Sequence, residues 1–140
     1  MSNLDLWTCP HCGRQFTNRN QSHSCARYTV ESRLESTSPQ VASLYAHFVE
    51  LVNNCGEVII EATKTSITFK SPGLFAVVHF QKMGLQVSFW LPRRIENSRI
   101  LRIYANSPQE YAHHLKLVYL EDFDEQLQNW LCEAYAVGMG

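Results

Sequence analysis

The sequence predicts an α+β fold, in which an antiparallel β-sheet of four to six strands carries two helices packed on one face. Two observations predict it. Two segments have apolar residues at helical spacing, and the region between them alternates polar and apolar residues with a period of two. The turns between the alternating runs are short, which favours an antiparallel meander because parallel strands need crossovers of a dozen residues or more.

Length and composition fit one domain with a small module attached. The chain has 140 residues, of which 45% are hydrophobic and 18% charged, so it can bury a core and does not belong to the disordered class. No apolar run approaches the roughly 18 residues of a membrane-spanning helix. The segment Met1 to Asp5 lacks the basic start of a secretory signal, so we expect a cytoplasmic protein with no membrane partner.

The first helix is predicted to begin at Ser38-Pro39, since serine can cap the first N–H groups and proline at the first helical position loses no hydrogen bond. Gly56 supplies a left-handed stop. One apolar stripe runs along this helix and consists of Val41, Leu44, Tyr45, Phe48, Leu51 and Val52.

Strands are predicted between Glu57 and about Leu120. The alternating runs are Thr65-Ile67-Phe69, Phe75-Val77-His79, Leu85-Val87-Phe89-Leu91, Leu101-Ile103 and Leu115-Leu117. Turn signals separate them, at Ser71-Pro72-Gly73, Met83-Gly84, Leu91-Pro92 and Asn106-Ser107-Pro108. His113 and His114 should then point to opposite faces of the sheet.

The second helix is predicted to be capped by Asp122, with Glu125 completing a capping box. Its apolar face consists of Phe123, Leu127, Trp130, Leu131 and Ala134. Cys55 and Cys132 lie on or beside apolar helix faces, where we expect buried thiols.

A zinc ribbon or knuckle is predicted at the N-terminus. Cys9-Pro10-His11-Cys12-Gly13 is a turn that directs two thiolates at one ion, and the second ligand pair would be His23 and Cys25. His11 is an alternative to His23 as the nitrogen ligand, at the cost of strain inside the turn. Four protein ligands leave no place for an activated water, so the Zn²⁺ would be structural. We therefore divide the chain into a zinc module (residues 1–28), a linker (29–38) and the α+β domain (39–136).

Charge is distributed in blocks although the formal net charge is only −1. Residues 1–34 hold four arginines against two acids, and residues 62–118 hold eight basic residues against two acids, whereas residues 35–61 and 119–140 hold acids alone. Basic segments with interleaved aromatics suit an anionic partner, most simply nucleic acid. The residues predicted to contact it are Arg14, Arg19 and Arg27 on the zinc module, and Lys64, Lys70, Trp90, Arg93, Arg94 and His114 on the sheet.

Other interpretations stay open at this point. The polar sheet face could simply be solvated, or the chain could be a protein-interaction adaptor that uses its acidic segments. A third is a small-ligand or enzymatic domain that uses Lys64 and His114. The sequence favours a non-catalytic protein over an enzyme, because it contains no phosphate-binding loop, dinucleotide fingerprint or His-Glu-x-x-His motif.

Several separated motifs, in order and spacing, resemble those of one family. They are Trp7-Thr8-Cys9-Pro10, Cys12-Gly13-Arg14 with Phe16, Asn20-Gln21, His23-Ser24-Cys25, Lys64-Thr65, Ile67 with Phe69, Leu91-Pro92-Arg93, Trp130-Leu131 and Ala134-Tyr135. Together they resemble a bacterial and archaeal family named domain of unknown function 5655. The resemblance implies a compact domain, alone or attached to other modules, with no established activity. It also implies Cys9, Cys12, His23 and Cys25 as the zinc ligands.

Overall fold

The structure is a computed structural model, and it describes residues 7–8, 15–16 and 29–140. Strand β1 (Trp7–Thr8) pairs antiparallel with β2 (Gln15–Phe16), and Trp7 lies opposite Phe16. The predicted zinc ligands and the basic residues predicted on the same module lie outside the described residues. These are Cys9, Cys12, His23 and Cys25, and Arg14, Arg19 and Arg27.

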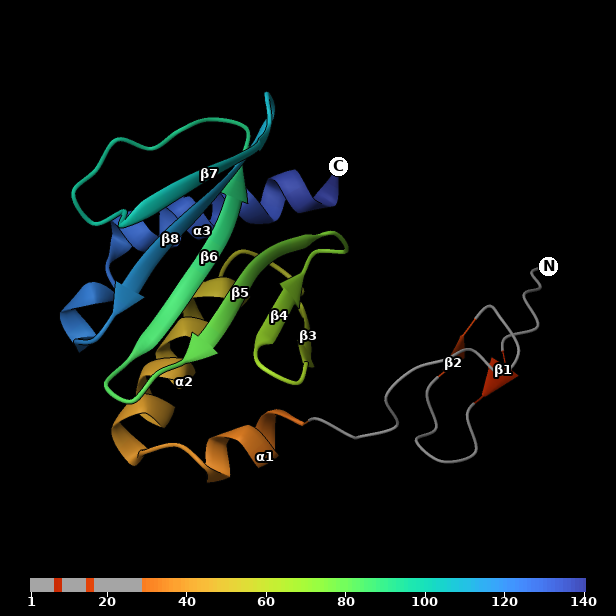
Figure 1. The fold of residues 1–140 in the computed structure, drawn as a ribbon, viewed down its shortest axis with the longest axis vertical. Helices are drawn as coiled ribbons and strands as arrows, with labels where there is room; N and C mark the ends of the chain where they lie inside the picture. The colour runs from red at the N-terminus through yellow and green to blue at the C-terminus, as the bar shows by residue number, and fades with distance from the viewer. Residues whose placement is uncertain (1–6, 9–14, 17–28) are drawn as a thin grey trace.

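The main sheet has six strands, all of which pair antiparallel. In chain order the strands are β3 (Ile59–Ala62), β4 (Ile67–Lys70), β5 (Leu74–Phe80), β6 (Leu85–Leu91), β7 (Arg102–Ser107) and β8 (Glu110–Leu117). Their order in space is β3-β4-β5-β6-β8-β7. The predicted meander holds for the first four strands, which follow one another in space, and is wrong for the last two. After residues 92–101 the chain forms β7 at the edge, and β8 then returns between β6 and β7 (Figure 1).

Two long helices, α2 (Pro39–Asn53) and α3 (Glu125–Met139), lie against one face of this sheet (Figure 1). This confirms the predicted α+β class with both helices on a single face. Ser38 caps α2 by accepting a hydrogen bond from the Val41 N–H at 3.2 Å, as predicted. No helix in the described part of the chain is long and apolar enough to cross a membrane.

The core lies between the helices and the sheet. Its largest fully buried side chains include Phe48 from α2, Phe69 from β4, Phe89 from β6 and Leu131 from α3. The Phe48 and Phe69 rings pack edge to face with centroids 5.0 Å apart. These four elements therefore contribute to one continuous core between the helices and the sheet.

Part of the predicted linker is helical. Helix α1 (Val30–Glu35) is capped by Thr29, whose hydroxyl accepts from the Ser32 N–H at 3.0 Å. Val30 and Leu34 pack against the core. These two apolar residues are four apart and lie on one side of a single helical turn, a pattern too short to stand out among the surrounding polar residues.

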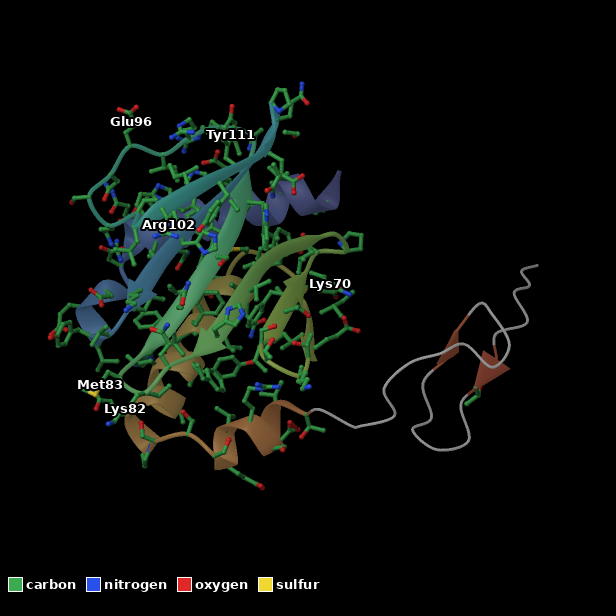
Figure 2. All side chains as sticks on the ribbon, viewed as in Figure 1. Lys70, Lys82, Met83, Glu96, Arg102 and Tyr111 are labelled. Atoms are coloured by element: carbon green, nitrogen blue, oxygen red, sulfur yellow. A yellow bond between two sulfur atoms is a disulfide. The ribbon has the colours of Figure 1, made fainter. Side chains whose placement is uncertain are left out.

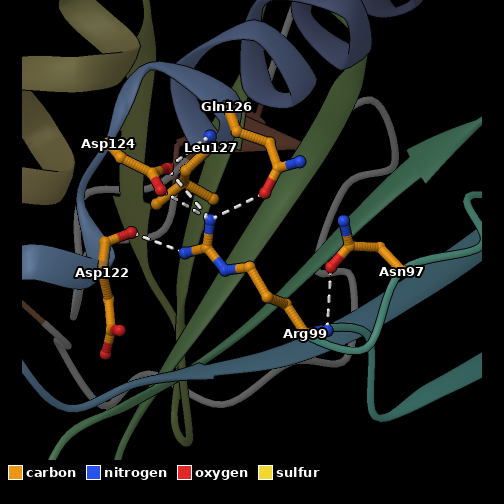
Figure 3. Close-up of polar contacts among 6 residues, drawn as sticks. All are labelled: Asn97, Arg99, Asp122, Asp124, Gln126 and Leu127. Atoms are coloured by element: carbon orange, nitrogen blue, oxygen red, sulfur yellow. Dashed lines mark hydrogen bonds and ion pairs between the residues drawn. The ribbon is translucent and has the colours of Figure 1, made fainter.

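The cap of the last helix is Asp124, not the predicted Asp122. The Asp124 carboxylate accepts from the Leu127 N–H at 2.9 Å and from the Arg99 guanidinium at 2.9 Å (Figure 3). Residues Leu120–Asp122 form a 3₁₀ turn (η1) before the helix begins, and the Asp122 carboxylate accepts from the N–H groups of Val118 and Tyr119. The chain thus uses one acid to close the turn and the next to start the helix.

Strand β5 faces the core with the opposite set of residues from the predicted one. Ala76 and Val78 are fully buried, whereas Val77 and His79 are only half-buried and lie on the other face. The register shifts between Phe69 and Lys70, where β4 meets the start of β5. Phe75 is therefore buried before the regular alternation begins. From Ala76 onward the residues that face the core are shifted by one position from the alternating run taken from the sequence.

Cys55 and Cys132 form a disulfide, which corrects the prediction of two separate buried thiols. It joins the turn after α2 to the middle of α3, beside a hydrogen bond from Asn54 Nδ2 to Gln128 Oε1. The two cysteines are 77 residues apart in the sequence, and only the packing of the two helices brings them together.

Candidate functional site

The face of the sheet opposite the helices is called here the open face, because no helix of residues 29–140 packs on it (Figure 1). Strand pairing fixes which residues share it. On the three strands farthest along the sheet these residues are Gln86, Ser88 and Trp90 from β6, Ala112, His114 and Lys116 from β8, and Arg102 and Tyr104 from β7. The open face is thus polar, basic and aromatic on β6, β8 and β7.

His114 occupies the middle of one cross-strand row, between Ser88 on β6 and Arg102 on β7. Its Nδ1 lies 2.9 Å from the Ser88 hydroxyl oxygen. Partial burial lowers the pKa of His114 below its ordinary value, and the positive charge of Arg102 lowers it further. The ring is therefore neutral at neutral pH.

Arg102 and Tyr104 are two residues apart on β7 and share the open face. The Arg102 guanidinium donates to the Tyr104 hydroxyl at 2.8 Å. The Tyr104 ring meets the His114 ring edge to face at 5.1 Å, and 46% of Tyr104 remains exposed. Contacts along the strand and across to β8 therefore position the phenol, while much of its surface stays available to a ligand. Figure 2 shows where Arg102 lies on the sheet.

A pocket of about 260 Å³ opens between these side chains, and it is called here the β7/β8 pocket. Its lining consists of Gln86, Leu101, Arg102, Tyr104, His114 and Lys116. The lining contains two cations and no carboxylate. The structure records three ion pairs among the described residues, and neither Arg102 nor Lys116 takes part in them.

Two of the predicted contact residues lie at the far side of the sheet. Lys70 on β4 makes an ion pair with Glu61 on β3, with 2.7 Å between Nζ and Oε1. Lys64 is exposed in the bend between β3 and β4 and is not part of the β4 strand. Strands β5 and β6 separate β4 from β8, so the structure does not bring Lys64 and His114 together.

Arg93 and Arg94 lie in the segment between β6 and β7, and their contacts are elsewhere. Arg93 donates twice to Glu133 on α3, at 2.8 Å from Nε and 2.8 Å from Nη2. This pairing lowers the pKa of Glu133, and partial burial opposes it only in part. The Arg94 guanidinium lies 5.8 Å from the centre of the Tyr111 ring. Arg93 is thus engaged on the helix side of the molecule.

Trp90 and His114 do lie on the open face, as predicted. Trp90 is half-buried and shares a cross-strand row with Ala112 and Tyr104. The alanine side chain in the middle of this row is small, so two aromatic residues flank a shallow position. They stand two strand spacings apart, about 10 Å.

The pocket residues Arg102 and Lys116 were not among the predicted contact residues, although the sequence contained the signal. Alternation along Leu101-Arg102-Ile103 places Arg102 on the face opposite Ile103, and alternation along β8 places Lys116 with His114. The sequence does not show which strands are neighbours in the sheet. The position of β7 next to β8, with β8 next to β6, is what gathers these residues.

The arrangement suits binding better than nucleophilic catalysis. Ser88 and His114 are one hydrogen bond apart, but Ser88 is 5% exposed. No carboxylate lines the β7/β8 pocket to orient the imidazole. Among the described residues there is also no cluster of three or more histidine, cysteine, aspartate or glutamate side chains that could hold a metal ion.

Comparison with known protein families gives the following match. The sequence model of a family described as "Domain of unknown function (DUF5655)" matches residues 30–138. This range begins at the first residue of α1 and ends within α3. No curated protein and no solved structure matches the chain significantly.

Proposed function

Because the chain belongs to the DUF5655 family, whose description names no activity, its function must come from its own site, and we propose that it is a binding module for nucleic acid. The partner would lie on the open face and contact the β7/β8 pocket. This retains the anionic partner expected from the sequence and moves the principal contacts from β4 to β7 and β8.

The observation that carries the proposal is the availability of Arg102 and Lys116. Each lines the pocket, and neither makes an ion pair among the described residues, whereas Lys70 and Arg93 are each paired with a glutamate. A cation already paired with a carboxylate must give up that contact to bind a phosphate. Arg102 and Lys116 carry no such cost, so they are the better phosphate ligands.

The aromatic residues beside the pocket favour a single strand. Exposed bases can stack on Tyr104, which is 46% exposed, and on the accessible part of Trp90 in the same row. Stacking tolerates any base, since every base has a π-face, so we expect little sequence preference. Paired bases in a duplex would not reach these rings.

We also propose that Cys9, Cys12, His23 and Cys25 bind one structural Zn²⁺. Supporting this, β1 pairs with β2 and so brings together the residues that flank the Cys9–Cys12 segment. Three thiolates and one imidazole form an ordinary tetrahedral zinc set. Elemental analysis should find one zinc ion per chain, lost in Cys9→Ser/Cys12→Ser and kept in Cys55→Ala/Cys132→Ala.

The test of nucleic-acid binding is fluorescence anisotropy with short labelled single-stranded and duplex DNA and RNA across a salt series. We expect a single strand to bind at low salt and to dissociate steeply as salt rises. Arg102→Glu/Lys116→Glu should weaken binding by about tenfold or more, since two phosphate contacts become repulsive.

The matched control is Lys64→Glu/Lys82→Glu, which changes the charge by the same amount at two exposed positions outside the pocket. Equal losses in the two double variants would show attraction by net charge alone and would remove the open face from the proposal. Flat anisotropy at low salt would overturn nucleic-acid binding altogether. Partners that survive nuclease treatment in a pull-down from the cytoplasm, the proposed location, would then favour the adaptor.

A further inference from the structure

We infer that the β7/β8 pocket binds a terminal phosphate group, the phosphomonoester at the end of a nucleic-acid strand, in preference to the phosphodiesters along the strand. The inference depends on the proposed function, because it names the group that this site would recognise. Three features of the pocket carry it: its charge, the direction of its hydrogen bonds and its place at the edge of the sheet.

The charge of the pocket matches a dianion. Arg102 and Lys116 contribute two positive charges, and the six lining residues include no carboxylate. A phosphodiester carries one negative charge, whereas a phosphomonoester carries about −1.5 to −2 at neutral pH. A terminal phosphate would therefore neutralise both cations, while a diester would leave one of them unsatisfied.

The polar groups of the pocket are donors. The Gln86 side-chain oxygen already accepts from Gln81 Nε2 at 2.8 Å, which leaves the Gln86 NH₂ group to donate. The Tyr104 hydroxyl oxygen accepts from Arg102 and keeps its own proton for a ligand. When the Ser88 hydroxyl donates to Nδ1 of His114, the neutral ring carries its proton on Nε2 and is a donor as well.

Together with Arg102 and Lys116, these groups make up a lining that offers protons and few lone pairs. The terminal phosphate has three oxygens that are free to accept, whereas a diester has two. The donors of the pocket can therefore form more hydrogen bonds with a terminal phosphate than with a phosphodiester. A metal cation would find no carboxylate in this lining, so an anion is the ligand that fits.

The position of the pocket suits the end of a strand. It lies beside β7, the strand at the edge of the sheet. The end of a nucleic-acid strand can therefore enter the pocket from this edge, without the rest of the strand having to pass through the pocket. Its volume of about 260 Å³ exceeds that of a single phosphate and leaves room for part of the attached sugar. The following bases would then reach Tyr104 and Trp90, which share one row across β7, β8 and β6.

The experiment compares one single-stranded sequence in three forms: with a 5′-phosphate, with a 3′-phosphate and with hydroxyls at both ends, each carrying the fluorophore away from the end under test. We expect one phosphorylated form to bind about tenfold more tightly than the hydroxyl form, which corresponds to one additional charge-assisted interaction. Inorganic phosphate should compete with that additional affinity.

Arg102→Gln/Lys116→Gln should abolish the difference between the forms, and Lys64→Gln/Lys82→Gln should preserve it. Tyr104→Phe keeps the ring and removes one donor, so it should reduce the preference for the phosphorylated form. Circular dichroism of each variant checks that the fold is retained.

Equal affinity for all three forms would overturn this inference and leave the proposed function standing. Absence of binding by every form would overturn both. A third result, strong competition by phosphate or a free nucleotide without any gain from a strand phosphate, would overturn the assignment to a strand end and identify a site for small phosphate compounds.

Discussion

His113 is fully buried beneath the sheet, and both of its ring nitrogens are engaged. Nδ1 lies 3.0 Å from the Tyr111 carbonyl oxygen, and Nε2 accepts from the Ile95 N–H at 3.0 Å. The ring also stacks on Phe89 with centroids 5.2 Å apart. Only the neutral imidazole, with its proton on Nδ1, satisfies both hydrogen bonds, so the side chain holds the segment after β6 in place.

Stability should therefore depend on pH through this histidine. Burial lowers the pKa of folded His113 below 6.5, so the unfolded chain binds more protons just below that pH. We expect the contribution of His113 to be complete above about pH 6.5 and to be lost as the pH falls toward the folded pKa. Urea unfolding at several pH values between neutral and mildly acidic would measure the slope.

The variant for this prediction is His113→Leu, which removes the titrating group and the acceptor for Ile95. It should lower the free energy of unfolding at neutral pH by about 1–3 kcal/mol, because the buried N–H loses its partner. It should also flatten the acid slope, whereas His47→Gln should retain it. An unchanged slope in His113→Leu would assign the pH dependence to other groups.

At the scale of single residues, the sequence predicts which face of the sheet a side chain lies on, but it does not predict which residues that side chain contacts. Alternation alone correctly placed His113 and His114 on opposite faces. It could not show that Lys70 and Arg93 are paired, because their partners are set by strand pairing and helix packing. Glu133 lies 40 residues from Arg93 in the sequence.

The segment of residues 92–101 is the longest connection within the sheet, and Arg99 attaches it to the start of α3. The guanidinium donates to both Asp124 carboxylate oxygens, at 2.9 and 3.1 Å, and to the Asp122 carbonyl at 2.6 Å (Figure 3). It also lies 5.7 Å from the centre of the Trp130 ring. One side chain thus connects the segment, the 3₁₀ turn and the helix cap.

Arg99→Ala should lower the free energy of unfolding by about 1–2 kcal/mol, a value kept modest because the ion pair is partly exposed to solvent. Arg99→Lys should recover only part of the loss, since an ammonium cannot reproduce the planar fork. The matched control is Arg102→Ala, which should change stability by less than about 0.5 kcal/mol. Thermal unfolding compares the three, and equal losses in Arg99→Ala and Arg102→Ala would contradict the anchoring role.

At the scale of elements, the presence of a helix or strand was easier to predict than which of its residues face the core. The α2 helix was predicted from its stripe and its serine cap, and the structure confirms both. Strand β5 was read one residue out of phase because Ala76-Val78-Phe80 and Phe75-Val77-His79 are both plausible apolar sets. The register shift beside Lys70, which decides between them, is a property of two strands and is not written in either.

At the scale of the whole molecule, a disulfide in the described part of the chain links the turn after α2 to the middle of α3. The disulfide joins residues 77 apart, so it removes a large amount of freedom from the unfolded chain. In the chain-entropy account a loop of this length contributes about 4.5 kcal/mol. We predicted free thiols at Cys55 and Cys132 because the sequence does not show that the end of α2 lies beside the middle of α3.

Reduction should therefore lower the unfolding midpoint of the wild-type protein to that of Cys55→Ala/Cys132→Ala, which should itself be unaffected by a reductant. Denaturant unfolding with and without dithiothreitol measures both. A wild-type midpoint that does not change with the reductant would show that the link adds nothing to stability. Thiol counting on protein taken directly from cells would report which form exists in the proposed cytoplasmic location.

The same link changes the topology of the backbone. Residues 55 to 132 become a covalently closed ring, and every strand of the six-stranded sheet belongs to it. A protease that cuts the exposed turn of Pro108 and Gln109 would open the ring without dividing the molecule. The nicked protein should migrate as one band on a non-reducing gel and separate into two fragments only after reduction.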